Sequence, residues 1–331
     1  MTGRIELDLD ERAFTVVDVV SDSPEWEQER SGSLGASESP AILGLSPWDT
    51  PLSIWRRKKG APDDFDPVLG FIGHRSEVII AEWVERFSDQ AGVKLEPAFM
   101  ARSVECPWLH ASFDRISHDE TGRLVTWQFK TAHQYGSHHW DEGVPTDIRV
   151  QVQQEIFVAG TEGAWVVVWI GGREFRMFWE PRDERFIRDY LIPTTEAFWF
   201  DHVVAAVAPE PSTLAEVDAL MPGDADHVLD GDERLYDLWS EFGRQQALEK
   251  EAAQMLDVVK LELKKAMQAA EAIELRHDGK TLFTWKQNKP TRVFDKKRFE
   301  ADHPDLAAEY TSTRPGNRPF FRKTVKQVTH D

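Results

Sequence analysis

Strand-like and helix-like runs alternate along residues 30–202, and this alternation limits the fold more than any other feature of the chain. The last three of the four strand-like runs are rich in β-branched and aromatic residues, which favour strands. The strand-like runs are residues 108–116, 124–131, 164–170 and 174–179. The helix-like runs are residues 77–87, 149–159 and 182–206. Interleaved strands and helices predict an α/β (α+β) fold with a central mixed sheet flanked by helices.

An acidic segment divides the chain. Residues 207–232 contain prolines, glycines and a run of acids, a composition typical of a linker. Beyond it, residues 242–273 carry apolar side chains at spacings of three and four, which predicts a long helix for packing or self-association. The His277-Asp-Gly-Lys280 sequence then predicts a β-hairpin. We therefore expect a main domain at residues 1–206, the linker, and a C-terminal helical and hairpin module at residues 233–331.

Composition excludes several classes of protein. The single cysteine, Cys106, excludes an intramolecular disulfide and a cysteine-rich zinc site. The first residues hold no apolar run that would serve as a signal peptide, and no later stretch approaches a membrane span, so we expect a soluble intracellular protein. The net charge of −19 argues against a nucleic-acid partner. However, residues 286–326 hold eleven Lys or Arg against five acids, so a local phosphate-binding surface stays open.

The run of residues 124–130 carries the candidate chemistry. In a strand, Thr126, Gln128 and Lys130 project to one face and the apolar residues between them project to the other. Asp114 ends another strand-like run, and a hairpin would place it beside Gln128. A carboxylate, an amide and an ammonium would then surround one point, which suits a hard cation and an attacking water. By spacing alone, however, an ordinary polar hairpin face is the favoured interpretation.

Further motifs change that balance. Gly73-His-Arg-Ser-Glu77 opens a predicted helix with a carboxylate, and Gln151-Val-Gln-Gln154 lies at the start of another. Together with residues 29–60, 108–114 and 127–132, they resemble the lambda-type phage exonucleases, the YqaJ-like viral recombinase family of the restriction-endonuclease-like nucleases. The most specific stretch is Ala36-Ser37-Glu38, followed by Ile42-Leu-Gly-Leu-Ser-Pro47 and Thr50-Pro51. The resemblance covers about residues 29–200 and extends loosely to residues 294–312.

The resemblance implies a metal site on the two strands. Asp114 would be the central metal ligand, and the backbone carbonyl of Phe129 would complete the site. Gln128 stands where the family has a metal-ligating glutamate, and Lys130 would position the nucleophilic water. The implied fold is a restriction-endonuclease-like core with the C-terminal module appended, and residues 1–206 would be the exonuclease domain.

The resemblance also assigns four residues outside these strands. Glu77 matches the helix carboxylate that supports the metal site, and Gln151 matches an active-site glutamine. Arg30 and Ser37 match positions that hold the terminal 5′-phosphate of duplex DNA. Ser37 suits this role physically, because it precedes a helical run whose free N–H groups attract a phosphate.

The departure at Gln128 weakens the implied metal site, because an amide removes one negative charge from the ligands of a divalent cation. Two explanations stay open: a deliberate Glu→Gln change that traps a DNA complex, or a natural sequence that works with a weaker site. A third, in which Glu155 compensates, is less favoured because its spacing from Gln151 is that of an ordinary helix-face pair.

The leading hypothesis is a Mg²⁺-dependent exonuclease, with Mn²⁺ as a substitute, that digests linear duplex DNA from the 5′ end. The 3′ overhangs would serve phage recombination by strand annealing. The resemblance implies a RecT- or beta-like annealing partner, a homo-oligomeric ring, and the cytoplasm of a bacterial host carrying the phage or prophage. The lack of an apolar span in the sequence predicts no membrane partner. The alternative is a catalytically impaired DNA-end-binding protein of the same fold. A site-specific endonuclease is less favoured, since no extra recognition domain is evident.

Three other patterns allow two interpretations each. The histidines His133, His138 and His139, with Trp140, fit a solvated or DNA-facing loop better than a zinc site. The basic run at residues 56–59 fits a helix C-terminus and a phosphate contact equally well. The basic tail fits a solvated hairpin, or DNA or protein binding. Its cations are Lys296, Lys297, Arg298, Arg314, Arg318, Arg322, Lys323 and Lys326.

Overall fold

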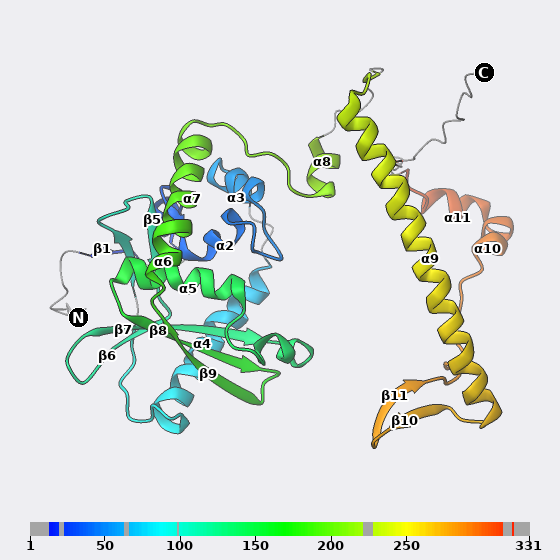
Figure 1. Ribbon diagram of the computed structural model, residues 1–331, viewed down its shortest axis with the longest axis horizontal. Coiled ribbons are helices and arrows are strands. Elements are labelled where there is room, and N and C mark those ends of the chain that lie inside the picture. Colours follow the sequence, from blue (N-terminus) through cyan, green and yellow to red (C-terminus); the bar gives the residue numbers. More distant parts are fainter. Residues whose placement is uncertain are drawn as a thin grey trace. The chain divides into compact units, whose positions relative to one another are not determined.

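The structure is a computed structural model that describes residues 13–19, 23–62, 66–97, 99–220, 228–313 and 320. The chain forms two compact units, Met1–Gly223 and Asp224–Asp331. Figure 1 shows the first unit as strands enclosed by helices and the second as a long helix with smaller elements. No helix within the described ranges has the length and apolar character that crossing a bilayer requires.

A five-stranded sheet carries the central part of the first unit. Its strands, in spatial order, are β3 (Glu96–Pro97), β6 (Arg115–His118), β7 (Leu124–Ala132), β8 (Gly163–Ile170) and β9 (Glu174–Pro181). Strands β7 and β8 pair in parallel, whereas the other neighbours pair antiparallel. The predicted central mixed sheet is therefore confirmed.

One helix covers each face of this sheet (Figure 1). On one face, Ile80 and Val84 of α4 (Pro67–Phe87) pack against Trp127 and Phe129. On the other face, α5 (Thr146–Ala159) packs against β8 with its own apolar residues. The alternation predicted for residues 124–130 is thus confirmed, because the apolar residues of β7 face α4 while Gln128 and Lys130 face α5.

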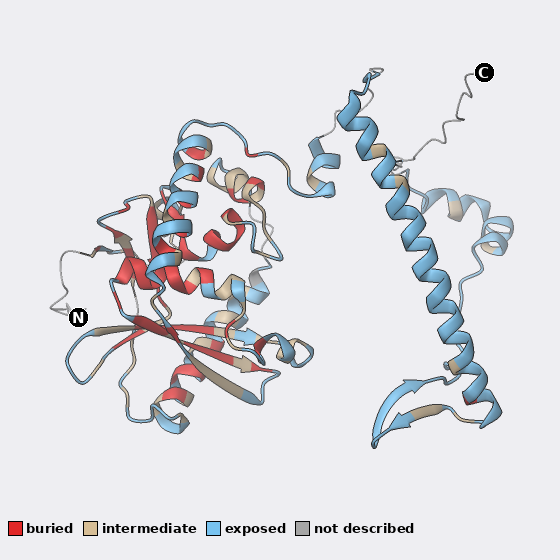
Figure 2. Cartoon of the chain, in the orientation of Figure 1, coloured by how far each residue is buried: buried red, intermediate tan, exposed pale blue. Residues whose placement is uncertain are grey.

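Helix α5 is buried on both sides, as its red colour in Figure 2 shows. Its second apolar side packs against a four-stranded sheet. The strands of that sheet, in order, are β1 (Phe14–Val17), β4 (Met100–Ser103), β5 (Leu109–Ser112) and β2 (Leu34–Gly35). The helix ends at Ala159, and the next residue, Gly160, has a positive φ of 69°, the left-handed conformation that favours glycine. Polar side chains on α5 therefore need partners inside the protein.

The other elements of the first unit are short helices. They are α1 (Pro24–Ser31), the 3₁₀ helix η1 (Ala36–Glu38), α2 (Ser39–Ile42), α3 (Pro51–Lys58), the 3₁₀ helix η2 (Gln134–Trp140), α6 (Glu184–Phe186), the π-helix η3 (Ile187–Leu191), α7 (Ile192–Ala197), the π-helix η4 (Phe198–Val204) and α8 (Leu214–Leu220). The last helix lies within the segment expected as a linker, and residues 221–227 lie outside the described residues.

Two predicted boundaries are wrong. Residues 108–116 were expected as one strand, but the chain bends at Asp114 and passes from the four-stranded to the five-stranded sheet. Helix α4 was expected to open near Gly73, but it begins at Pro67, where the Asp66 carboxylate accepts a hydrogen bond from Val68 N at 2.8 Å. Glu77 consequently lies in the middle of a long helix.

The second unit is built on α9 (Glu233–Ala269), which begins earlier than predicted because the Asp232 side chain caps it by accepting from Leu235 N. The predicted hairpin is confirmed as β10 (Glu274–His277) and β11 (Lys280–Thr284). Its turn residues, Asp278 and Gly279, have positive φ angles of 48° and 75°. Helices α10 (Lys296–Asp302) and α11 (Pro304–Glu309) follow. Figure 2 shows this unit as almost entirely exposed.

Candidate active site

Asp114 lies at the bend between β5 and β6, and the hairpin register brings it beside β7. Arg115 pairs with Trp127, so the preceding Asp114 falls opposite Gln128. The Asp114 Oδ2 atom accepts hydrogen bonds from Gln128 Nε2 at 2.7 Å and from the Phe129 backbone N–H at 2.6 Å. The carboxylate is therefore fixed by the neighbouring strand.

The Gln128 amide group lies between two oxygen atoms. Its Nε2 donates to Asp114 Oδ2 at 2.7 Å and to the Phe129 carbonyl oxygen at 3.3 Å. Its Oε1 accepts from Gln151 Nε2 at 3.2 Å. The side chain is only 4% exposed. An amide NH₂ thus occupies the point on which a carboxylate oxygen and a carbonyl oxygen converge.

Lys130 and Glu155 fix the orientation of both glutamine amides. The Lys130 ammonium can only donate, so the Gln151 Oε1 faces it at 2.9 Å. The Gln151 Nε2 then donates to Glu155 Oε1 at 2.8 Å and to Gln128 Oε1. With its oxygen engaged in this way, Gln128 presents its NH₂ to Asp114. Strand β7 and helix α5 therefore share one directional hydrogen-bond network.

The carboxyl groups of this network have raised pKa values. Burial, followed by the negative charge of Glu77, raises the pKa of Asp114 to about 7, against the opposing effect of Lys130. Burial, followed by the charge of Asp114, raises the pKa of Glu155 to about 8, again against Lys130. Protons therefore stay on these carboxyl groups at a higher pH than on ordinary carboxyl groups.

Glu77 reaches the site from α4, on the other face of the sheet. It contacts Arg115 at 3.5 Å and His74 at 3.3 Å. Burial raises the pKa of Glu77, although the charges of His74 and Arg115 oppose this effect. The negative charge of Glu77 therefore raises the pKa of Asp114 from a distance, while Glu77 itself pairs with Arg115 and His74.

The oxygen atoms at this point suit a hard cation. Asp114 Oδ2 and the Phe129 carbonyl oxygen are ligands of the type that Mg²⁺ prefers. The Gln128 NH₂, with its partial positive charge, stands between them where a cation would share both oxygens. The described part of the chain contains no group of three or more His, Cys, Asp or Glu that could hold a metal ion. A cation here would therefore depend on few carboxylates and on displacement of the Gln128 NH₂.

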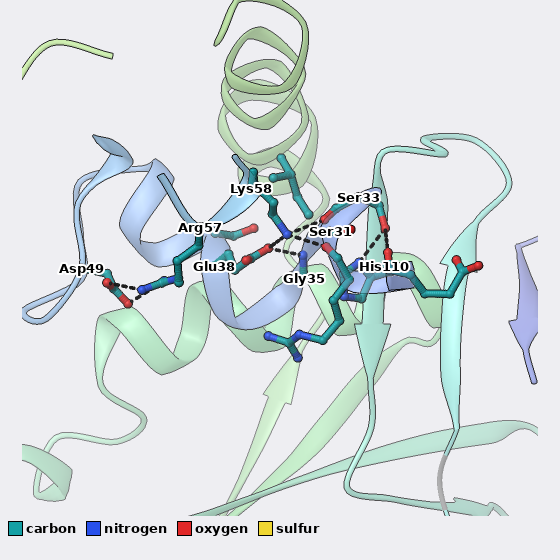
Figure 3. A network of polar contacts seen from close by, with 12 residues as sticks. Ser31, Ser33, Gly35, Glu38, Asp49, Arg57, Lys58 and His110 are labelled. Atoms are coloured by element: carbon teal, nitrogen blue, oxygen red, sulfur yellow. Dashed lines mark hydrogen bonds and ion pairs between the residues drawn. The ribbon is translucent and has the colours of Figure 1, made fainter. Parts of the chain in front are cut away.

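Arg30 and Ser37, the expected phosphate ligands, flank a second buried network, which Figure 3 shows. The Lys58 ammonium donates to the carbonyl oxygens of Arg30 at 2.6 Å and Ser33 at 2.7 Å. It also pairs with Glu38 at 2.7 Å, next to the exposed Ser37. The Arg30 guanidinium lies 4.5 Å from the centre of the Trp26 ring. Lys58 thus bonds the backbone carbonyl of Arg30 and the side chain of Glu38, the residue after Ser37.

Close packing around His110 completes this second network. The Ser33 Oγ lies 2.8 Å from His110 Nδ1, and the Glu38 carboxylate accepts from Gly35 N at 2.7 Å. Burial, followed by the positive charges of Lys58, Arg30 and Arg102, holds the pKa of His110 well below its usual value. A Cβ at Gly35 would lie 3.0 Å from His110 Nε2, so this position leaves little room for a side chain.

The basic run at residues 56–59 is largely engaged within the protein. The Lys58 side chain is only 3% exposed, so the phosphate-contact interpretation is wrong for this residue. Arg57 makes two hydrogen bonds to Asp49, at 2.8 and 3.0 Å, and Lys59 donates to the Val203 carbonyl oxygen at 2.6 Å. The interpretation of the run as a helix C-terminus is confirmed, since α3 ends at Lys58.

The histidine-rich segment forms η2, between β7 and α5. His133, His138 and His139 are exposed, which agrees with a solvated loop. Trp140 is 4% exposed and packs among the apolar residues of α5 and β8, so the expectation that it faces DNA is wrong. In the basic tail, Lys296 and Arg298 pair with acids one helical turn away, and residues 314–319 and 321–331 lie outside the described residues.

Sequence reasoning gave too little weight to the polar residues of α5. Gln153 bonds to Glu180, the Pro181 carbonyl and Asp183 N, whereas Gln154 donates to the carbonyls of Leu34 and His110. Glu155 is 1% exposed. The available signal was three consecutive polar residues, at positions 153–155, directly followed by the apolar run of residues 156–159, which indicates internal polar partners.

Comparison with known proteins finds a family match within the first unit. Residues 25–162 match the family model of the YqaJ-like viral recombinase domain. A Bacillus subtilis (strain 168) protein described as uncharacterized protein YqaJ is 31% identical over 200 residues, which are 58% of this chain. The match covers 60% of that relative, so the chain spans less than two thirds of its length. The family resemblance indicated by the sequence motifs is confirmed over this region.

Solved structures match part of this chain at low sequence identity. The crystal structure of an alkaline exonuclease from Laribacter hongkongensis has a TM-score of 0.46 and 15% identity, covering 56% of this chain and 94% of that chain. The structure of the same exonuclease in complex with dAMP has a TM-score of 0.45 and 14% identity, with the same coverage.

Proposed function

We propose, on the premise that residues 25–162 form a domain of the YqaJ-like viral recombinase family, that this protein is a nuclease that acts on DNA ends. In its specific form, the proposal is a Mg²⁺-dependent exonuclease that digests linear duplex DNA from the 5′ end. The products would be 3′ single-stranded overhangs used in phage recombination by strand annealing. One observation carries the proposal: Asp114, Gln128, Lys130 and Gln151 converge on a single point between β7 and α5.

The charged and polar groups have complementary tasks in phosphodiester hydrolysis. Asp114 and the Phe129 carbonyl would hold a divalent cation, which supplies charge stabilisation at the scissile phosphate. The Lys130 ammonium, held at 2.9 Å by Gln151, would orient the attacking water and offset negative charge that develops in the transition state. Glu77 would keep Arg115 in place and adjust the charge around Asp114.

Recognition of the DNA end is assigned to Arg30 and Ser37. Arg30 supplies a cation and Ser37 an exposed hydroxyl, and phosphate groups bind to both kinds of side chain. The Lys58–Glu38 network would support these two residues from inside the protein, because Lys58 donates to the Arg30 carbonyl while Glu38 follows Ser37 in the chain. Loss of either proposed ligand should therefore weaken discrimination between 5′-phosphorylated and 5′-hydroxyl ends.

The test is digestion of linear duplex DNA that carries 5′-phosphates, in the presence of Mg²⁺. We compare the parent chain with Gln128→Glu and with Asp114→Asn, and we follow nucleotide release. Digestion by the parent and by Gln128→Glu, but not by Asp114→Asn, supports the proposal. If no form digests DNA although each binds its ends, the nuclease assignment fails. Cleavage of closed circular DNA would instead indicate an endonuclease.

A second candidate function is that of an end-binding protein with impaired cleavage. The position of the Gln128 NH₂ favours it, because this group donates to the two oxygens that a cation would need. In that case only Gln128→Glu would digest DNA, while the parent chain would bind 5′-phosphorylated ends with similar affinity. The same digestion experiment therefore separates the two candidates.

The proposal also includes partners taken from the family. We expect a ring of identical subunits around the DNA and a RecT- or beta-like annealing protein that receives the 3′ overhang, in the cytoplasm of a bacterial host. Light scattering of the purified chain tests the ring, since a monomer at working concentration would contradict it. Co-purification with a RecT- or beta-like single-strand annealing protein tests the second partner.

A further inference from the structure

Glu155 is a buried carboxyl group that makes no ion pair among the described residues, although Lys130 lies on the far side of the Gln151 amide. It is 1% exposed, and within the described ranges no Lys, Arg or His forms an ion pair with it. Its hydrogen-bond donor is the neutral amide of Gln151, at 2.8 Å. Burying a charge is costly unless the charge is paired or coordinates a metal, so a carboxylate in this environment needs an explanation.

The position of Glu155 connects it directly to Gln128. Gln151 Nε2 donates to Glu155 Oε1 at 2.8 Å and to Gln128 Oε1 at 3.2 Å, so both oxygens lie within reach of the same nitrogen. Helix α5 therefore places a carboxylate next to the strand position that lacks one. The spacing of Glu155 from Gln151 is that of an ordinary helix-face pair, but the face is an internal one.

The charges around the candidate cation site indicate a role for Glu155 in cation binding. The charges of Asp114 and Lys130 cancel, which leaves little attraction for a divalent cation among neutral amides and a carbonyl. When a bound cation displaces the proton from Glu155, the Glu155 carboxylate adds one negative charge next to this point, as a glutamate at position 128 would. Glu77 is less suited to this task because it pairs with Arg115 and His74.

We propose that Glu155 supplies, from helix α5, the negative charge that Gln128 does not supply from strand β7, so that Asp114 and Glu155 are the two carboxylates of the divalent-cation site. This inference rests on the proposed function, because it concerns the cation of that same site. Without a cation, the Gln128 NH₂ donates hydrogen bonds to the Asp114 and Phe129 oxygens. A bound cation would displace this NH₂ and take both oxygens as ligands.

The test measures Mn²⁺ binding to the full chain by electron paramagnetic resonance, without DNA. We expect Glu155→Gln to weaken Mn²⁺ binding by about tenfold or more, as losses of supporting groups around metals do. Adding Gln128→Glu to Glu155→Gln should restore binding to within about threefold of the parent, since one carboxylate replaces the other. Asp114→Asn should abolish binding.

Glu180→Gln is the matched control. Glu180 is also a largely buried glutamate, 8% exposed, and it contacts the same helix through Gln153. Its replacement should leave Mn²⁺ binding unchanged. Circular dichroism of each variant verifies the fold, and the rescue by Gln128→Glu distinguishes a lost ligand charge from a damaged helix.

The outcomes separate this inference from the proposed function. If Glu155→Gln binds Mn²⁺ as the parent does, or if the parent binds none, the inference is overturned, and DNA digestion by Gln128→Glu then decides the proposed function independently. If Mn²⁺ binding depends on Glu155 and is rescued at position 128, the inference stands, even where no variant digests DNA.

Discussion

Replacing Lys58 by methionine should strongly destabilise the first unit. The Lys58 and Glu38 side chains are 3% and 9% exposed, and their charged atoms are 2.7 Å apart. Methionine keeps the apolar stem of lysine but leaves the Glu38 carboxylate with the Gly35 N–H and without its cation. Removing one partner of a buried ion pair costs about 3–5 kcal/mol. The carbonyls of Arg30 and Ser33 lose a donor as well.

Most of the lost stability should come from the Glu38 carboxylate, which stays buried without a cation. Burial lowers the pKa of Lys58 even though Glu38 opposes this effect, so the charged lysine gains little from its surroundings. A double variant, Lys58→Met with Glu38→Gln, should therefore recover much of the lost stability, because an amide can still accept from Gly35 and needs no cation. For a unit of this size, the single change should lower Tm by about 10 °C.

The assay is urea unfolding followed by tryptophan fluorescence. Eleven of the 13 tryptophans lie in the first unit, because Trp239 and Trp285 are the two beyond residue 223, so the signal reports mainly on that unit. The matched control is Lys94→Met, at an exposed lysine, which should change the free energy of unfolding by less than about 0.5 kcal/mol. A loss below about 1 kcal/mol for Lys58→Met would refute the reasoning.

Three further predictions concern other parts of the first unit. Gly35→Ala should destabilise by about 1–3 kcal/mol, because its Cβ would lie 3.0 Å from His110 Nε2. Gly73→Ala should raise the Tm slightly, because a Cβ at this position in α4 would have no atom within 4 Å. Thermal melts that show the same change in Tm for Gly35→Ala and Gly73→Ala would contradict this prediction. Cys106 is 3% exposed and burial raises its pKa to about 11, so native protein at pH 8 should react with iodoacetamide far more slowly than protein in guanidinium chloride. With EDTA present, stability should fall as pH rises from about 4 toward 8, because the folded chain holds protons on Asp114 and Glu155, with pKa values of about 7 and about 8, more tightly than the unfolded chain. Glu155→Gln should flatten this pH dependence of Tm, and an unchanged slope would show that Glu155 titrates normally.

Local patterns in the sequence were sufficient to predict several elements. The alternation of residues 124–130 follows from strand geometry and correctly placed Gln128 and Lys130 on the face opposite Trp127. The Asp278-Gly279 turn was predictable because its positive φ angles favour this residue pair. The periodicity after residue 242 indicated a long helix, although the Asp232 cap that starts it was missed.

The errors share one cause, which is that burial depends on contacts far apart in the chain. The basic run around Lys58 predicts a surface cation, but the Lys58 ammonium is buried and donates to the carbonyls of Arg30 and Ser33. Trp140 reads as part of an exposed histidine-rich segment, yet it packs against α5 and β8. The spacing of Glu155 from Gln151 predicts an ordinary pair on an exposed helix face. Spacing alone does not show that α5 lies between two sheets, which makes this face internal.

The sequence by itself determined the family motifs and the main strands and helices around residues 124–181, because these depend on residue type and short-range spacing. The residues of the candidate active site followed from the family resemblance that those motifs carry. Only the tertiary structure decided which polar groups face one another inside the protein. It placed the Gln128 NH₂ between Asp114 and the Phe129 carbonyl, and it brought Glu155 next to them from another element. The orientation of an amide and the burial of a carboxylate follow from all surrounding donors and acceptors together, and this information arises only when the chain folds.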